Sequence, residues 1–154
     1  MFTTLPKTCV LQKLATPDLV FLGTRHKRPR ILNFIASVVL DLHDAGVTHI
    51  GLEIDVDQQV AVDKYMAVGN GLAEIKIIPA IDCVKYRQVL SALHALPPEK
   101  RPACVALDLP DALCGQEISR KEYMAAGIKR LFEKEPAAKM LVVVGNLHTL
   151  KKLE

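Results

Sequence analysis

Apolar residues are distributed along the chain in two alternating patterns. Short continuous runs predict strands that are buried on both faces, and longer stretches with an apolar residue every three or four positions predict amphipathic helices. The predicted strands cover residues 18–24, 48–54, 103–108 and 140–145. The predicted helices cover residues 29–45, 58–68, 86–96 and 120–134.

Local signals mark the ends of these helices. Pro29 suits a first helical turn, and Gly46 suits the position that follows a last turn. The consecutive Pro97 and Pro98 end the third predicted helix. Ser119 and Glu122 are spaced as a capping box, which predicts that both side chains bond to the backbone at the start of the fourth helix.

Strands that alternate with helices predict an α/β fold. Because the runs are apolar throughout, we expect an open, mainly parallel sheet with helices on both faces, and a short helical cap region in the middle of the chain. A length of 154 residues fits one domain over 1–154. The chain stops abruptly after its last motif, so truncation at the C-terminus stays open as an alternative.

Composition narrows the class of protein. Hydrophobic residues make up 50% of the chain and charged residues 24%, which excludes a disordered protein. A net charge of only +3 gives no support for nucleic-acid binding. No stretch reaches the roughly 18 apolar residues of a membrane span, and the first residues lack the apolar core of a signal peptide. We therefore expect a cytoplasmic protein whose 4 cysteines, none in a CxxC pair, are reduced.

Polar side chains stand where the predicted strands end. Two Gly-x-x-His segments, at residues 23–26 and 145–148, follow the first and last strands, and Glu53 ends the second strand. Parallel strands present their carboxyl ends at one edge of the sheet, where ligands bind. We therefore expect His26, Glu53 and His148 to lie together at that edge.

Two imidazoles and a carboxylate are a common ligand set for a catalytic divalent metal ion, so these three residues are candidate metal ligands. The same side chains could instead perform general acid–base chemistry without a metal, with Glu53 orienting an imidazole. Because a lone buried carboxylate is costly, a structural ion pair of Glu53 with Arg25 or Arg120 is the plainer alternative. If Glu53 has no cation beside it, removing its charge should stabilise the fold by about 1 kcal/mol or more.

Two further features have both a functional and a plain interpretation. Asp108 ends the third predicted strand, where it either joins the site or serves as a cap or turn residue before Pro110. Residues 24–30 form a basic loop at the start of a predicted helix, a position that suits anion binding. The alternative is a solvated loop, which we expect for its Lys27, Arg28 and Arg30.

Four segments of the chain resemble a known superfamily, which groups the ChaN haem-binding proteins, the TraB and Tiki proteins, and the erythromycin esterase-like enzymes. The segments are residues 21–26, 50–59, 120–125 and 144–149, and they occur in the same order as in that superfamily. Tiki-type metalloproteases use two Gly-x-x-His motifs and a glutamate, which by resemblance implies His26, Glu53 and His148. Arg120 matches an arginine at the start of the helix that follows the third strand.

The resemblance implies a metal-assisted hydrolase. A bound water would attack an ester or amide carbonyl of a small-molecule or peptide substrate, and Arg25, Arg120 or Asn146 would stabilise the oxyanion. The alternative is a protein that binds haem or another planar ligand at the same edge without turnover, with a homodimer as one possible assembly.

Overall fold

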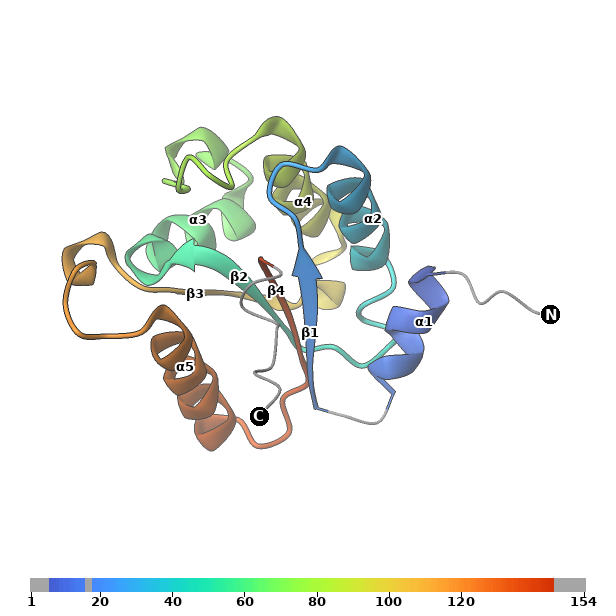
Figure 1. Cartoon of the computed structure of the whole chain (residues 1–154). Helices are drawn as coiled ribbons and strands as arrows, with labels where there is room; N and C mark the ends of the chain where they lie inside the picture. The colour runs from blue at the N-terminus through green and yellow to red at the C-terminus, as the bar shows by residue number, and fades with distance from the viewer. Residues whose placement is uncertain (1–5, 16–17, 146–154) are drawn as a thin grey trace.

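A four-stranded parallel sheet forms the centre of the fold in the computed structural model, which describes residues 6–15 and 18–145 (Figure 1). The strands are β1 (Leu19–Thr24), β2 (His49–Asp55), β3 (Ala103–Asp108) and β4 (Met140–Gly145). Their order across the sheet is β1-β4-β2-β3, so the last strand in the sequence lies between the first two. The carboxyl ends of β1, β4 and β2 are therefore direct neighbours at one edge.

Helices cover both faces of this sheet, which confirms the predicted fold class. Three helices, α2 (Pro29–Val39), α3 (Gln59–Val68) and α4 (Val84–Ala95), lie on one face, and α5 (Arg120–Lys134) lies on the other. The middle of the chain, where we expected a helical cap region, supplies α4, which packs against α2 and α3. The fold also contains α1 (Pro6–Lys13), which packs against α2, and short 3₁₀ turns at Val56–Gln58, Leu72–Glu74, Pro98–Lys100 and Asp111–Leu113.

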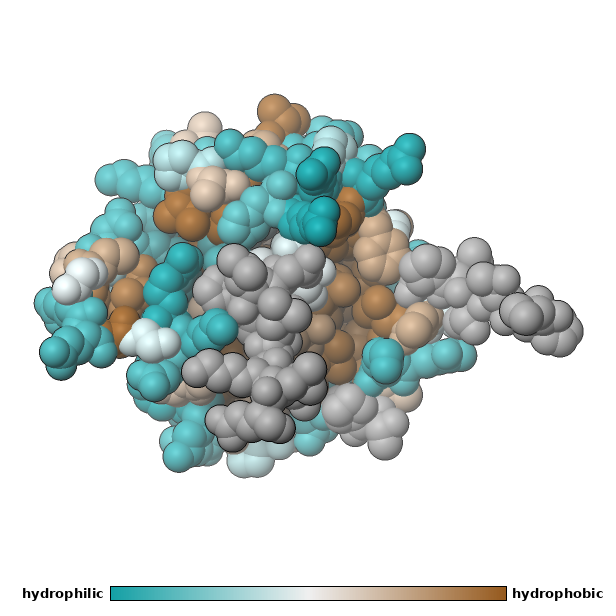
Figure 2. All heavy atoms as spheres, viewed as in Figure 1, coloured by the Kyte–Doolittle hydropathy of each residue, from teal (hydrophilic) through white to brown (hydrophobic). Residues whose placement is uncertain are grey.

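Two hydrophobic cores hold these layers together. The larger core lies between the sheet and α2, α3 and α4, and it contains fully buried residues such as Ile35, Ile50 and Leu90. The smaller core lies under α5 and joins Leu107, Met124, Ile128, Met140, Val142 and Val144. On the edge strand β1, Phe21 remains 46% exposed, and Figure 2 shows apolar side chains gathered over this strand. None of the helices within the described residues combines the length and the hydropathy that a bilayer span requires.

Two local predictions differ from the structure. The helix predicted over 29–45 ends at Val39, because the backbone N–H groups of Asp41 and Leu42 donate to carbonyls three residues back and tighten the chain into turns. Ser119 occupies the N-cap position of α5, but its side chain makes no capping hydrogen bond, so the predicted capping box is wrong. The first backbone bond of this helix instead joins the Tyr123 N–H to the Ser119 carbonyl at 2.9 Å.

All four cysteines are free in the structure. Cys9 and Cys114 are exposed, Cys83 is half-buried and Cys104 is buried in the larger core. Burial raises the pKa of the Cys104 thiol to about 12, and the nearby charge of Asp63 adds a smaller increase. Since the thiolate is the reactive form, burial and the raised pKa both protect Cys104.

We predict that iodoacetamide at pH 8 alkylates Cys9 and Cys114 rapidly in the folded protein and reaches Cys104 only after unfolding. Peptide mass spectrometry before and after denaturation measures the order of modification. Modification of Cys104 in the folded protein at the rate of Cys114 would contradict both its burial and its raised pKa.

Candidate active site at the carboxyl edge of the sheet

Glu53 is the buried acid of this edge. Its neighbours on β2, Leu52 and Ile54, belong to the larger core, so the alternation of side chains along a strand directs Glu53 to the α5 face. The residue is only 3% exposed. Its Oε2 atom accepts a hydrogen bond from the backbone N–H of Gly145 at 2.9 Å. The carboxylate of β2 is thereby fixed to the last residue of the neighbouring strand β4.

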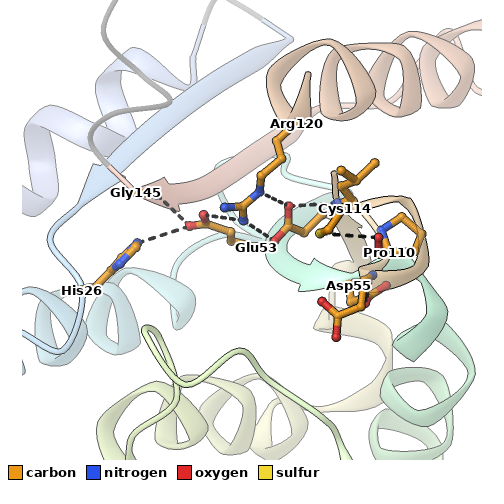
Figure 3. A network of polar contacts seen from close by, with 10 residues as sticks. His26, Glu53, Asp55, Pro110, Cys114, Arg120 and Gly145 are labelled. Atoms are coloured by element: carbon orange, nitrogen blue, oxygen red, sulfur yellow. Dashed lines mark hydrogen bonds and ion pairs between the residues drawn. The ribbon is translucent and has the colours of Figure 1, made fainter. Parts of the chain in front are cut away.

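Arg120 connects two carboxylates that stand on neighbouring strands (Figure 3). It is the first residue of α5, and its Nε donates to Asp108 Oδ1 at 2.9 Å while its Nη2 donates to Asp108 Oδ2. The same Nη2 lies 3.4 Å from Glu53 Oε1. The hydrogen bond to Asp108 raises the pKa of Arg120, and the charge of Glu53 raises it further. Glu53 therefore has the ion pair with Arg120 that we gave as the plainer alternative.

Asp108 serves in both of the roles considered for it. Besides holding Arg120, its Oδ1 accepts a hydrogen bond from the Leu109 backbone N–H at 2.8 Å, where the strand turns toward Pro110. The residue is 3% exposed, so its charge is as deeply buried as that of Glu53. Asp108 is therefore both a turn residue at the end of β3 and one of the two carboxylates that contact the guanidinium of Arg120.

His26 approaches Glu53 from the side opposite to Arg120. Its Nε2 lies 3.7 Å from Glu53 Oε2, which is too long for a hydrogen bond but close enough for an electrostatic interaction. The His26 side chain is 41% exposed, so solvent reaches the ring. A Cβ atom at position 145 would stand 2.7 Å from His26 Nε2 and 3.6 Å from Glu53 Oε2. The contact of His26 with Glu53 thus depends on glycine at the end of β4.

Tyr86 adds a buried hydroxyl that sequence reasoning missed. It stands in the first turn of α4 and is 6% exposed. Among the described residues, its hydroxyl is the one buried side-chain polar atom without a hydrogen-bond partner. Burial raises the pKa of Tyr86, and the charges of Glu53 and Asp108 raise it further. A tyrosine at helical apolar spacing predicts only a core residue, so the sequence carries no signal for this position.

Of the remaining predicted site residues, one is described by the structure and two are not. Arg25 is exposed in the loop after β1 and makes no ion pair within residues 6–15 and 18–145. Asn146 and His148 lie outside the described residues, so the meeting of His26 with His148 stays a prediction. In the part of the chain that the structure describes, no three His, Cys, Asp or Glu side chains form a group that could hold a metal ion.

The site and the sheet define the class of this protein as a parallel α/β domain with a charged cluster at the carboxyl edge. No protein-family model and no curated protein sequence matches the chain. Among solved structures, the type III effector HopBA1 is similar with a TM-score of 0.70 and 15% identity, over 91% of this chain and 71% of that chain.

Two toxin structures share the fold over a smaller part of their own length. One, described as bacterial protein toxins, has a TM-score of 0.61 and 20% identity, and covers 94% of this chain but 31% of its own. The other is the C-terminal region of Pasteurella multocida toxin, described as having a thiol-protease-like catalytic triad. It has a TM-score of 0.59 and 14% identity, and covers 88% of this chain but 20% of its own. At these identities the likeness shows a shared fold.

We predict that Glu53→Gln lowers the free energy of unfolding by about 1–3 kcal/mol, because it leaves Arg120 with one carboxylate instead of two and weakens a buried hydrogen bond. This expected loss of stability is opposite to the gain that removing the charge of an unpaired buried carboxylate would give. Thermal and urea unfolding measure the change, with Glu99→Gln at an exposed position as the matched control. A melting temperature that rises in Glu53→Gln would show that the ion pair does not offset the burial of the charge.

We also predict that Gly145→Ala displaces the His26 ring from Glu53 with little loss of stability, because the new methyl group meets the end of a movable, part-exposed side chain. The His26 ring signals in NMR spectra report the displacement. Gly127→Ala in α5 is the control, since its Cβ would meet only atoms at 3.8 and 3.9 Å and alanine favours a helix by about 1 kcal/mol. Unchanged His26 signals in Gly145→Ala would contradict the close contact.

Proposed function

We propose that the protein is a hydrolase that cleaves an ester or amide bond of a small-molecule or peptide substrate at this edge of the sheet. The observation that carries the proposal is the buried carboxylate of Glu53, whose Oε2 faces His26 and whose Oε1 faces Arg120. Ionisable side chains that converge at the carboxyl ends of parallel strands are typical of an active site. The resemblance to the superfamily of ChaN, TraB, Tiki and erythromycin esterase-like proteins supports the same class of reaction.

His26 is suited to act as the general base. With Nε2 turned toward Glu53, the Nδ1 atom is left to accept a proton from water as the water oxygen attacks the carbonyl carbon. The negative charge of Glu53 stabilises the imidazolium that forms. The imidazolium then returns the proton to the leaving alcohol or amine as the ester or amide bond breaks. The distance of 3.7 Å is compatible with this role, because catalytic hydrogen bonds shorten when substrate binds.

Arg120 is suited to stabilise the oxyanion. Its Nε and Nη2 atoms are held by Asp108 and Glu53, which fixes the plane of the guanidinium. Among the described residues, no hydrogen bond engages its Nη1 atom, and the side chain is 40% exposed. Two N–H donors on a fixed, permanently charged group therefore remain for a developing negative charge. Arg25 is a second candidate for the same role.

A divalent metal ion fits the described residues less well than this metal-free arrangement. His26 and Glu53 are of the right ligand types, but both oxygens of Glu53 already contact other groups, Gly145 N–H and Arg120. The guanidinium at 3.4 Å would also repel a cation bound to the same carboxylate. Metal-assisted hydrolysis is the alternative proposal, and it requires a further ligand such as His148.

Haem binding without turnover is the other alternative. Imidazole is an axial ligand of haem iron, and the His26 ring is accessible to solvent. Among the described residues, this is the feature that supports haem binding. A Soret band that saturates at one equivalent of added haem and is lost in His26→Gln would favour this function over hydrolysis.

We predict that His26→Gln lowers hydrolysis of the best substrate in a panel of p-nitrophenyl esters and amino-acid p-nitroanilides by about 100-fold to 10,000-fold. The reason is that glutamine retains the size of the side chain but cannot take up the proton. His43→Gln is the matched control, because His43 is exposed in the turns that follow α2, away from the carboxyl edge.

Elemental analysis of untagged protein accompanies the assay and separates the two mechanisms. Activity without a stoichiometric metal supports the metal-free site, whereas a metal lost in both His26→Gln and Glu53→Gln supports the metal-assisted alternative. Equal hydrolysis by His26→Gln and the unaltered protein would refute an active site at His26.

A further inference from the structure

The two edge strands of the sheet are protected to different degrees. With the order β1-β4-β2-β3, β1 and β3 each have backbone groups that point away from the sheet. On β3, the Gln59 side chain bonds to two of these groups. Its Nε2 donates to the Cys104 carbonyl at 2.8 Å, and its Oε1 accepts from the Ala106 N–H at 2.7 Å. Gln59 thereby takes the place of a further strand along that edge.

The outer edge of β1 has no such protection. The Met140 N–H donates to the Asp18 carbonyl at 2.7 Å. Because the direction of the backbone groups alternates along a strand, every second residue from Asp18 onward faces β4. The N–H and C=O groups of Leu19, Phe21 and Gly23 therefore point away from the sheet. In the part of the chain that the structure describes, no hydrogen bond engages them.

β1 also lacks the features that usually prevent an edge strand from pairing. All 6 of its residues pair with β4 in one continuous register without a bulge, and none is charged or a proline. Phe21 is 46% exposed, and apolar side chains gather over this strand (Figure 2). The neighbouring helix α1 packs against α2. An open edge of this kind is a template for the addition of an extended chain.

This open edge leads directly to the candidate active site. β1 ends at Thr24, two residues before His26, whose Nε2 faces Glu53. An added strand would lie one strand spacing beyond β1, which is three spacings, or about 14 Å, from β2. At about 3.3 Å per residue, four or five residues beyond the paired segment would bring a peptide bond to His26 and Glu53.

We propose that the outer edge of β1 binds an extended peptide through main-chain hydrogen bonds and presents it to His26 as a substrate. The paired segment would place apolar side chains at alternate positions beside Phe21. Past the end of β1, the exposed Lys27 and Arg28 complement an acidic residue in the peptide. The role of the peptide as substrate rests on the proposed hydrolysis, whereas its binding at the edge does not.

The test is a titration of the full ¹⁵N-labelled chain with the synthetic peptide acetyl-TVTVTVDE-amide, followed by NMR. We expect saturable shifts of the Leu19, Phe21 and Gly23 amides and slower exchange of these amides with solvent. Two further forms of the peptide are N-methylated at every valine or at every threonine. At least one of them should bind at least about tenfold more weakly, because it loses the donors that face β1.

Two substitutions at one position test the edge from the side of the protein. Phe21→Pro removes an N–H group that points outward and leaves the hydrogen bonds to β4 in place, so it should weaken binding at least about tenfold. Phe21→Leu is the matched control, because it retains the N–H group and an apolar side chain, and it should bind within about threefold of the unaltered protein. Urea unfolding establishes that both variants are folded, and the N-methylated peptides provide the test if Phe21→Pro is not.

The proposal is overturned if the peptide gives no saturable shifts at millimolar concentration, or if Phe21→Pro binds as tightly as Phe21→Leu. It is also overturned if the three outward amides exchange slowly before peptide is added, since a second copy or another part of the chain would then occupy the edge. Chromatography of the peptide after incubation reports cleavage. Bound peptide that stays intact, in a protein that also hydrolyses no ester or anilide of the panel, would retain the binding edge and reject the hydrolase. Hydrolysis of the panel without peptide binding would retain the hydrolase and reject the edge.

Discussion

The contact of Arg120 with two buried carboxylates is the interaction on which the carboxyl edge depends. Glu53 and Asp108 are each 3% exposed, and an ion in such a position without a partner would cost several kcal/mol. Both project from strand ends that point the same way, so their negative charges also repel each other. Arg120 offsets both costs with a single group. Because it is the first residue of α5, the same contact fixes the start of that helix over the ends of β2 and β3.

The order of the strands gives this ion pair its connection to His26. With β4 between β1 and β2, the backbone of Gly145 reaches the Glu53 carboxylate, and the chain that leaves β1 passes close by. A strand order in which β1 and β2 were direct neighbours would remove the Gly145 N–H from this position. Glycine is required there because the imidazole occupies the space that a side chain would fill. The geometry of the site is therefore a property of the sheet as much as of the three side chains.

The sequence predicted the layers of the fold and part of the candidate site, and particular residues explain why. Continuous apolar runs identified the four strands to within a residue or two, and Glu53 was conspicuous as an acid at the end of such a run. The position of β4 in the sheet could not be predicted, because strand order depends on packing between segments far apart in the chain. The pairing of Asp108 with Arg120 was missed for the same reason, since Asp108 has an adequate local role as a turn residue.

Predictions that depended on one hydrogen bond were the least secure. Ser119 has the right residue type and position for a cap, yet its hydroxyl makes no capping bond, because sequence spacing does not determine the rotamer. Tyr86 shows the opposite case, in which apolar spacing identified burial correctly but gave no indication that the buried hydroxyl has no hydrogen-bond partner among the described residues. Burial follows from the pattern of apolar residues, whereas the partner of a buried polar atom depends on atoms from other elements.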